Sequence, residues 1–184
     1  MNRIASRRPA ASEWTLEYHA ELIRRVEGEC AIEALESQLH WICELAGHLS
    51  PVFVDTVHRP YRWTIRQVFE HCVDAERVFG YRMLRTAAGD TSPLATYDHD
   101  GYVERKFGLG NFSMLVTELG LVRQSNILLA RRIKPACWDH LAMVDGDAMS
   151  FRAIAWVAAG HLLHHFEIIE KRVGITVPRT APNS

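Results

Sequence analysis

Residues 150–174 have the sequence SFRAIAWVAAGHLLHHFEIIEKRVG, which predicts one long amphipathic helix. Six residues are spaced alternately three and four positions apart, so they form one stripe along the helix. In a helical bundle such a stripe faces the neighbouring helices. The stripe consists of Phe151, Ile154, Ala158, His161, His165 and Ile168. Two imidazoles one turn apart on a buried stripe need partners for their ring nitrogens, and this spacing lets one divalent metal ion serve both. Two hydrogen-bonded core histidines are the alternative from this helix alone.

A third histidine lies in the apolar face of an earlier predicted helix. His71 is one turn from Val68 and one turn from Ala75. Alone it is better explained as a hydrogen-bonded core residue, but beside His161 and His165 it becomes the third candidate ligand. Three imidazoles leave at least one coordination position open, as in catalytic rather than purely structural sites. Such a set of ligands suits zinc, nickel, iron(II) or copper.

The composition is that of an ordinary soluble domain. The 184 residues suffice for one domain with a sizeable core, and 48% of them are hydrophobic. A formal net charge of -1 argues against a nucleic-acid-binding protein and against a polybasic membrane module. No apolar run approaches the roughly 18 residues that a membrane-spanning helix needs.

The cysteines and the N-terminus indicate a cytoplasmic protein. The four cysteines form no CxxC pair, and most lie in apolar helical segments, which is typical of reduced thiols. The first residues, MNRIASRRPAAS, have basic side chains without an apolar run behind them, so they do not resemble a secretory signal.

Apolar periodicity and capping signals predict four long helices, at about residues 29–49, 64–88, 112–133 and 150–174. Thr64 and Gln67 have the spacing of a capping box at the start of the second. A short helix is expected within residues 12–27.

The segment between the second and third long helices is too long for a tight hairpin. Residues 89–111 contain four glycines and a proline, and they predict a long crossover. A turn or a small hairpin is expected near residues 144–147. The predicted fold is therefore an all-α, antiparallel four-helix bundle with a long crossover between helices 2 and 3. We expect a single domain at residues 12–174, with flexible tails at residues 1–11 and 175–184.

Two acidic residues follow His71 on the second long helix. Asp74, one turn further on, can hold a ligand ring in place through a hydrogen bond. The alternative is that Asp74 and Glu76 form surface ion pairs with Arg77 or Arg82.

The crossover and the last helix supply further pocket candidates. Asp100 and Tyr102 lie in the crossover, and together with His164 they are candidate proton shuttles. His164 is about 100° around the helix from His165, so we expect it at the mouth or flank of the site and not as a ligand. Asn126 interrupts the apolar stripe of the third long helix, and we expect it at the edge of that stripe, in contact with water.

Three blocks of the sequence resemble the DinB-like (damage-inducible) metal-binding four-helix-bundle family. They are RWTIRQVFEHCVDAERVFGYRMLRTAAGD at 62–90, TYDHDGYV at 96–103 and AGHLLHHFEII at 159–169. The similarity extends over nearly the whole chain, from Glu17 to Gly174. The first and last blocks are specific as a pair, although each alone is a weak signal.

The resemblance implies a divalent metal ion held by one histidine of the second helix and two of the last, here His71, His161 and His165. It also implies a cytoplasmic protein that forms a homodimer. Relatives include transferases and isomerases that use low-molecular-weight thiols, and proposed metal hydrolases. Many relatives carry an acidic residue directly after the first histidine of the last helix, where this chain has Leu162.

The sequence thus predicts a metal-dependent thiol S-transferase or hydrolase that acts on a small-molecule substrate. Its cofactors would be a divalent zinc, nickel or iron ion and, for transfer, a low-molecular-weight thiol. A non-catalytic metal-binding stress-response protein is the alternative, because no strong general base is evident. A plain bundle with three core histidines is a third interpretation.

Overall fold

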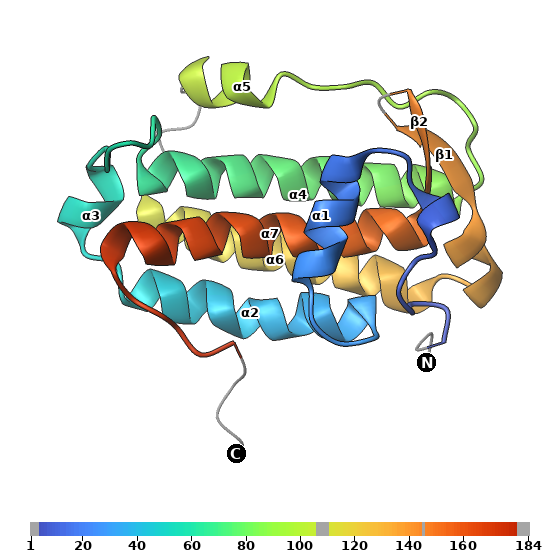
Figure 1. Ribbon diagram of the computed structural model, residues 1–184, viewed down its shortest axis with the longest axis horizontal. Coiled ribbons are helices and arrows are strands. Elements are labelled where there is room, and N and C mark those ends of the chain that lie inside the picture. The colour runs from blue at the N-terminus through green and yellow to red at the C-terminus, as the bar shows by residue number, and fades with distance from the viewer. Residues whose placement is uncertain (1–3, 106–110, 145, 180–184) are drawn as a thin grey trace.

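Four long helices form the body of the molecule in the computed structural model, which describes residues 4–105, 111–144 and 146–179 (Figure 1). They are α2 (Ala31–Gly47), α4 (Ile65–Ala87), α6 (Phe112–Arg132) and α7 (Phe151–Val173). The predicted all-α four-helix bundle is confirmed, and the helix limits lie within about two residues of those expected. Of the described helices, none is both long enough and apolar enough to cross a bilayer.

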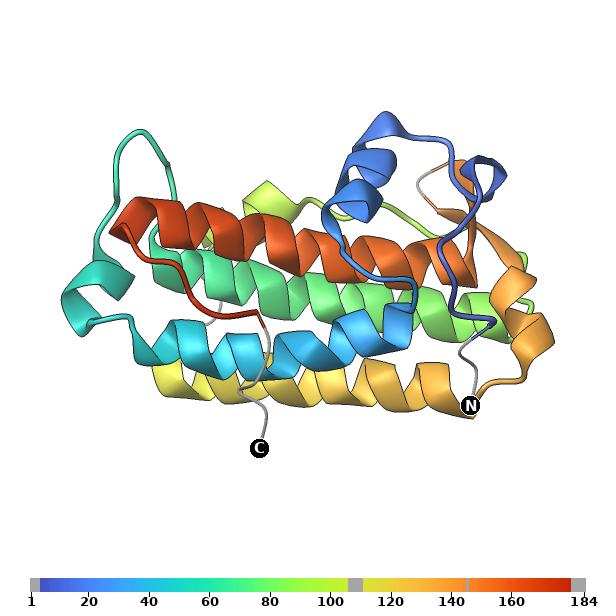
Figure 2. The same cartoon turned by 60° about the horizontal axis from the view of Figure 1, so that its bottom comes forward.

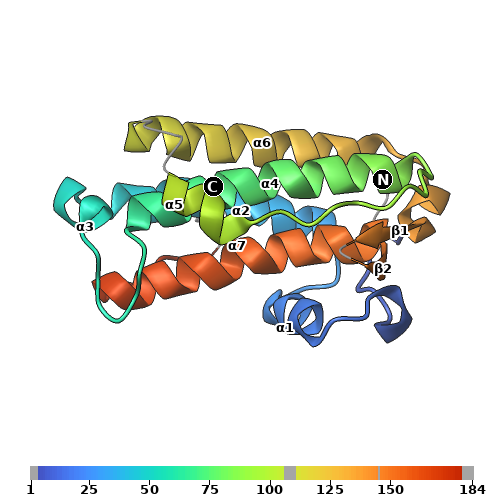
Figure 3. The ribbon, with the colours of Figure 1, turned by 90° about the horizontal axis from the view of Figure 1, so that it is seen from above.

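The crossover between α4 and α6 decides the direction of the helices. It carries the chain back along the bundle, so that α4 and α6 run side by side in the same direction (Figures 1 and 3). α7 returns antiparallel to α4, and α2 packs against both α6 and α7. A short helix that was not predicted, α5 (His99–Arg105), lies in the crossover.

Local capping signals fix where α4 and α7 begin. The Gln67 N–H donates to Thr64 Oγ1 at 3.2 Å, and the Thr64 N–H donates to Gln67 Oε1 at 2.9 Å, as the capping box predicts. Ser150 Oγ accepts the Ala153 N–H at 2.9 Å, and Gly174 ends α7 in the left-handed region with φ 71°. These caps set the phase of both helices that carry the three histidines.

α7 is the central helix, and each residue of 151–162 is buried. Small side chains let other elements approach it closely. α1 (Glu17–Arg25) crosses its outer face (Figure 2), and a Cβ atom at Gly160 would lie 2.1 Å from the Leu22 carbonyl oxygen. Glycine is therefore required at position 160, directly before His161.

Smaller elements close the two ends of the bundle. They are the helix α3 (Pro51–Asp55), the 3₁₀ turns η1 (Ala11–Glu13) and η2 (Pro135–Asp139), and an antiparallel hairpin of β1 (Leu141–Val144) and β2 (Asp147–Ser150). The hairpin occupies the position where a turn or small hairpin was expected. Its second strand leads directly into α7.

A buried polar network joins the four long helices. Arg123 of α6 is fully buried, and it donates to Glu76 Oε1 of α4 at 2.7 Å and to Gln38 Oε1 of α2 at 2.8 Å. Gln38 in turn donates to the Ala159 carbonyl of α7 at 2.8 Å. Asn126 Nδ2 donates to Glu76 Oε2 at 3.0 Å. The buried charges are thus both paired and hydrogen-bonded, as burial of an ion pair requires.

This network corrects two expectations from the sequence. Glu76 does not form a surface pair with Arg77 or Arg82, because it is 2% exposed and bonded to Arg123. Asn126 does not meet water at the edge of its stripe, because it is buried against Glu76.

The N-terminal residues pack against the bundle, although the sequence predicted a flexible tail there. Ser6 is fully buried, with its Oγ 3.0 Å from Cys30 Sγ. Trp156 Nε1 donates to the carbonyl oxygens of Ser6 at 3.1 Å and Arg7 at 2.9 Å. At the other end of the chain Val177 is also buried. Residues 1–3 and 180–184 of the two expected tails lie outside the described residues.

We predict that Glu76→Gln lowers the free energy of unfolding by about 3–5 kcal/mol, because it leaves the Arg123 guanidinium buried without its counter-charge. Urea unfolding followed by circular dichroism measures the change. The matched control is Glu118→Gln, which removes an exposed pair with Arg77 and should cost less than about 1 kcal/mol. Equal effects of the two substitutions would contradict the assigned role of the buried pair.

Candidate metal centre

Three imidazoles converge at one point between α4 and α7. His71 Nε2 lies 3.1 Å from His161 Nε2, and His165 Nε2 lies 3.2 Å from the same atom. The candidate ligand atoms of all three residues lie within 4.8 Å of one another. Tetrahedral zinc with Zn–N bonds of about 2.0–2.1 Å holds two ligand nitrogens about 3.3 Å apart. The two distances to His161 Nε2 are close to this spacing, so the three residues could hold a single metal ion.

α4 and α7 bring the rings together because they pack antiparallel and each is rotated so that its histidines face the other helix. His161 and His165 are one turn apart on α7, so that both rings project from the same face. His71 lies in the second turn of α4, whose start is fixed by the capping box. Aromatic rings pack around the group, with Trp63 at 5.3 Å from His71 and Phe79 at 5.4 Å from His161 between ring centroids.

Burial keeps the three imidazoles neutral. Burial first, and then the nearby His99, lowers the pKa of His71 from 6.5 to about 4. The pKa values of His161 and His165 also lie well below 6.5, first because of burial and then because each ring faces another imidazole of the group. At neutral pH each ring thus has a lone pair for a metal ion, without a proton to displace.

A pocket of about 310 Å³ opens beside the three histidines. Its lining residues come from α1 and the residue before it, the loop before α4, α4 itself, the crossover and α7: Leu16, Tyr18, His19, Leu22, Trp63, His71, Ala75, Val78, Phe79, Arg82, Thr96, Tyr97, His99, Val157, His161, His164 and His165. Seven of these side chains are apolar, and the other ten are six imidazoles, two phenols, a hydroxyl and a guanidinium. No carboxylate occurs among the described lining residues, so the pocket favours a neutral or anionic molecule.

The four polar candidates from the sequence lie in different places. His164 lines the pocket with its ring centroid 5.1 Å from that of His165, outside the group of converging ring nitrogens. Asp74 is half-buried and does not line the pocket, and its electrostatic neighbours are Arg77 and Glu118.

The crossover contributes different residues from the two that the sequence analysis chose. Tyr97 and His99 line the pocket, whereas Asp100 and Tyr102 do not. The His99 ring centroid is 5.8 Å from that of His71, and burial raises the pKa of Tyr97 to about 12. Asp100 is exposed, and its Oδ1 lies 3.6 Å from His99 Nε2. An imidazole within an aromatic-rich crossover was the available signal for His99.

Comparison with known proteins agrees with this architecture. A family model described as the DinB superfamily matches residues 31–169. The structure of YfiT from Bacillus subtilis, described as a probable metal-dependent hydrolase with an unusual four-helix bundle topology, is similar to this one with a TM-score of 0.70. The similarity covers 79% of this chain and 87% of YfiT at 18% sequence identity, and it shows a shared fold. No curated protein matches this sequence.

The depressed pKa values predict how the metal-free protein responds to acid. Below pH 6.5 the unfolded chain binds protons that the buried imidazoles do not, so the free energy of unfolding should fall as the pH falls from 6.5 toward about 4. His71→Gln removes one of these imidazoles and should flatten the fall. Urea unfolding at several pH values across this range measures the free energy of unfolding of each protein. His48→Gln, at an exposed site, should keep the slope of the wild type, and an unchanged slope in His71→Gln would contradict the prediction.

Proposed function

This chain belongs to the DinB superfamily, and on that premise we propose that it binds one divalent metal ion and uses it on a small molecule. His71, His161 and His165 would hold the ion. The observation that carries the proposal is the convergence of three neutral Nε2 atoms at one side of a pocket. Zinc, nickel and iron(II) all accept such a set of imidazoles.

The three protein ligands suit a reactive centre. When bound, a divalent ion supplies Lewis acidity and lowers the pKa of a coordinated water or thiol. Because the imidazoles are neutral, they would not compensate the positive charge of the bound metal ion. The site therefore favours a carbonyl, phosphoryl or thiolate group, in agreement with a pocket lining without described carboxylates.

The remaining pocket residues would orient the substrate and handle protons. Trp63, Phe79 and Val157 line an apolar wall that excludes water from the reacting group. His99 in the crossover would accept a proton through Nδ1, because its Nε2 faces the Asp100 carboxylate at 3.6 Å. His164 offers a second imidazole on the α7 side.

Hydrolysis and thiol transfer are the two reactions that this arrangement supports. YfiT, which shares the fold, is described as a probable metal-dependent hydrolase, which favours hydrolysis. Transfer to or from a low-molecular-weight thiol uses the same open position. Leu162 is 1% exposed in the core and does not line the pocket, so an apolar residue there leaves the described pocket lining unchanged. We place the protein in the cytoplasm as a homodimer on the family resemblance.

A metal-binding protein without turnover is the second candidate. The observation in its favour is the lack of a carboxylate base among the described residues of the pocket lining. Turnover of carboxyl esters, amides or thiol adducts by the metal-loaded protein, lost on chelation, distinguishes the enzyme from the binding protein. Metal-dependent stabilisation without turnover of any of these substrates would favour the second candidate.

We predict that His71→Ala, His161→Ala and His165→Ala each reduce metal content from about one ion per chain to nearly none, because two imidazoles hold an ion far less tightly than three. Elemental analysis of the purified proteins measures the ratio. His48→Ala, which changes an exposed histidine, should retain the metal of the wild type. A wild-type protein without stoichiometric metal after incubation with zinc, nickel and iron(II) would refute the proposed centre.

A further inference from the structure

One wall of the metal pocket comes from the N-terminal part of the chain. Leu16, Tyr18, His19 and Leu22, from α1 and the residue before it, line the pocket. α1 lies across α7 (Figure 2), and its Leu22 backbone approaches α7 closely at Gly160, next to His161. These four residues are called the N-terminal wall below.

The N-terminal wall lies outside the part of the chain that the DinB superfamily model matches. That match covers residues 31–169, and it includes the three histidines but not α1. The family match therefore does not account for this wall of the pocket. An element of this kind is suited to adjust which molecules reach a shared reactive centre.

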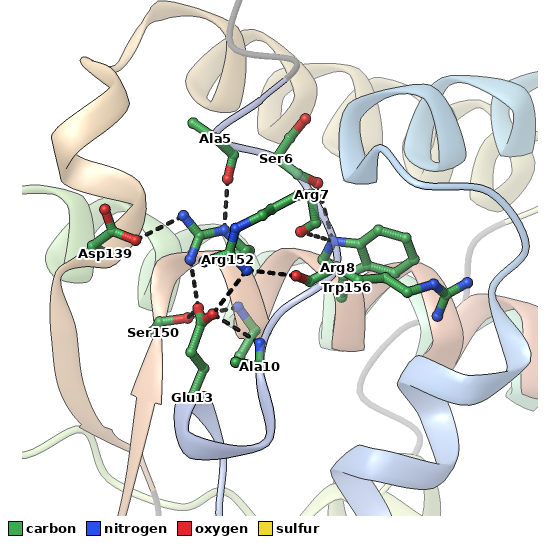
Figure 4. Close-up of polar contacts among 11 residues, drawn as sticks. Ala5, Ser6, Arg7, Arg8, Ala10, Glu13, Asp139, Ser150, Arg152 and Trp156 are labelled. Carbon is green, nitrogen blue, oxygen red and sulfur yellow. Dashed lines mark hydrogen bonds and ion pairs between the residues drawn. The ribbon is translucent and has the colours of Figure 1, made fainter.

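A buried arginine attaches the segment before α1 to the bundle (Figure 4). Arg152 of α7 is 3% exposed, and its Nε donates to the Ala5 carbonyl at 2.6 Å. Its Nη1 donates to Glu13 Oε2 at 2.7 Å, and its Nη2 donates to Asp139 Oδ1 at 2.7 Å. Ser150 Oγ donates to the same Glu13 oxygen at 2.6 Å. We call this set of contacts the Arg152 clamp.

A second contact connects the same segment to the far end of α1. The Arg8 guanidinium lies 4.6 Å from the centre of the Trp156 ring, and Trp156 is itself bonded to the preceding backbone. Arg8 Nη1 donates to the Ile23 carbonyl at 3.1 Å, and Nη2 donates to the Val26 carbonyl. The chain is thus held before α1 and at its C-terminal end, so α1 has little freedom to move away from α7.

We propose that the N-terminal wall, held by the Arg152 clamp, selects by size the molecules that reach the three histidines. This proposal rests on the proposed metal centre. A compact thiolate or carboxylate passes between α1 and the crossover to reach the metal ion. A thiolate or carboxylate with a bulky group next to its metal-binding atom is excluded. Leu16 and Tyr18 form the adjustable part, because they are 40% and 51% exposed and line the pocket. Leu22 is 1% exposed and serves packing.

The first test uses the cobalt(II)-loaded protein and two thiols of different size. Thiolate binding to cobalt changes its visible absorption, so titration with 2-mercaptoethanol and with 2-naphthalenethiol gives both affinities. The double variant Leu16→Ala/Tyr18→Ala should bind the naphthyl thiol about tenfold more tightly, with the affinity for 2-mercaptoethanol within about twofold of wild type. Equal changes for the two thiols, or no change for either, would overturn the proposal.

Control variants separate the wall from general effects on α1. Glu17→Gln changes a side chain that is 73% exposed and pairs with Arg24 on the outer face of α1, and it should keep the wild-type preference. Glu13→Gln weakens the Arg152 clamp and should shift the preference toward that of the double variant. The single variants Leu16→Ala and Tyr18→Ala are measured beside the double variant, and each should give part of its effect.

The second test needs no metal, so it distinguishes a failure of the wall from a failure of the proposed metal centre. Diethyl pyrocarbonate acylates accessible neutral imidazoles, and mass spectrometry of peptides containing His71 and His161 gives the rate at each. In the metal-free wild type both residues are buried and should react slowly. The double variant should react severalfold faster and Glu17→Gln at the wild-type rate. A double variant as slow as wild type would overturn the wall, whereas failure of the wild type to take up cobalt would refute only the metal centre.

Discussion

The buried pair of Arg123 and Glu76 is the constraint on which the bundle and its site depend. A charge in a protein core is tolerated only when it is paired and hydrogen-bonded, and this pair meets that demand through groups on all four long helices. A rotation of any one helix would leave a buried charge or amide without its partner. His161 lies within one helical turn of the two α7 carbonyls that take part, those of Ala158 and Ala159. The network therefore fixes the rotation that brings its ring toward His71.

The sequence predicts the bundle well because its signals are local. Caps, breakers and apolar periodicity lie within the helices that they define, as Thr64, Gln67 and Gly174 illustrate. The three histidines were found by the same periodicity, since an imidazole on a buried stripe stands out. The Arg123–Glu76 pair was missed because its members are 47 residues apart, and a charged residue next to an apolar face gives no sign of a distant partner.

The walls of the pocket depend on information that periodicity does not contain. α1 and the crossover are positioned by close backbone approach, as between Gly160 and Leu22, and by contacts such as those of Arg152 with Ala5 and Glu13. An arginine and proline-containing N-terminus has no apolar pattern, so the sequence predicted a tail where the structure has buried backbone. The reactive centre is thus more predictable than the surfaces that decide what can approach it.

The Arg152 clamp also has a consequence for the order in which the protein forms. The Arg152 bond to the Ala5 carbonyl connects residues 147 positions apart in the chain. Ribosomes deliver the N-terminus first, so residues 4–25 emerge long before the helix that receives them exists. Their contacts with α7 can form only once the C-terminal segment has left the exit tunnel. Closure of the pocket therefore follows the synthesis of α7, and a nascent chain arrested before residue 150 would leave α1 without its partner helix.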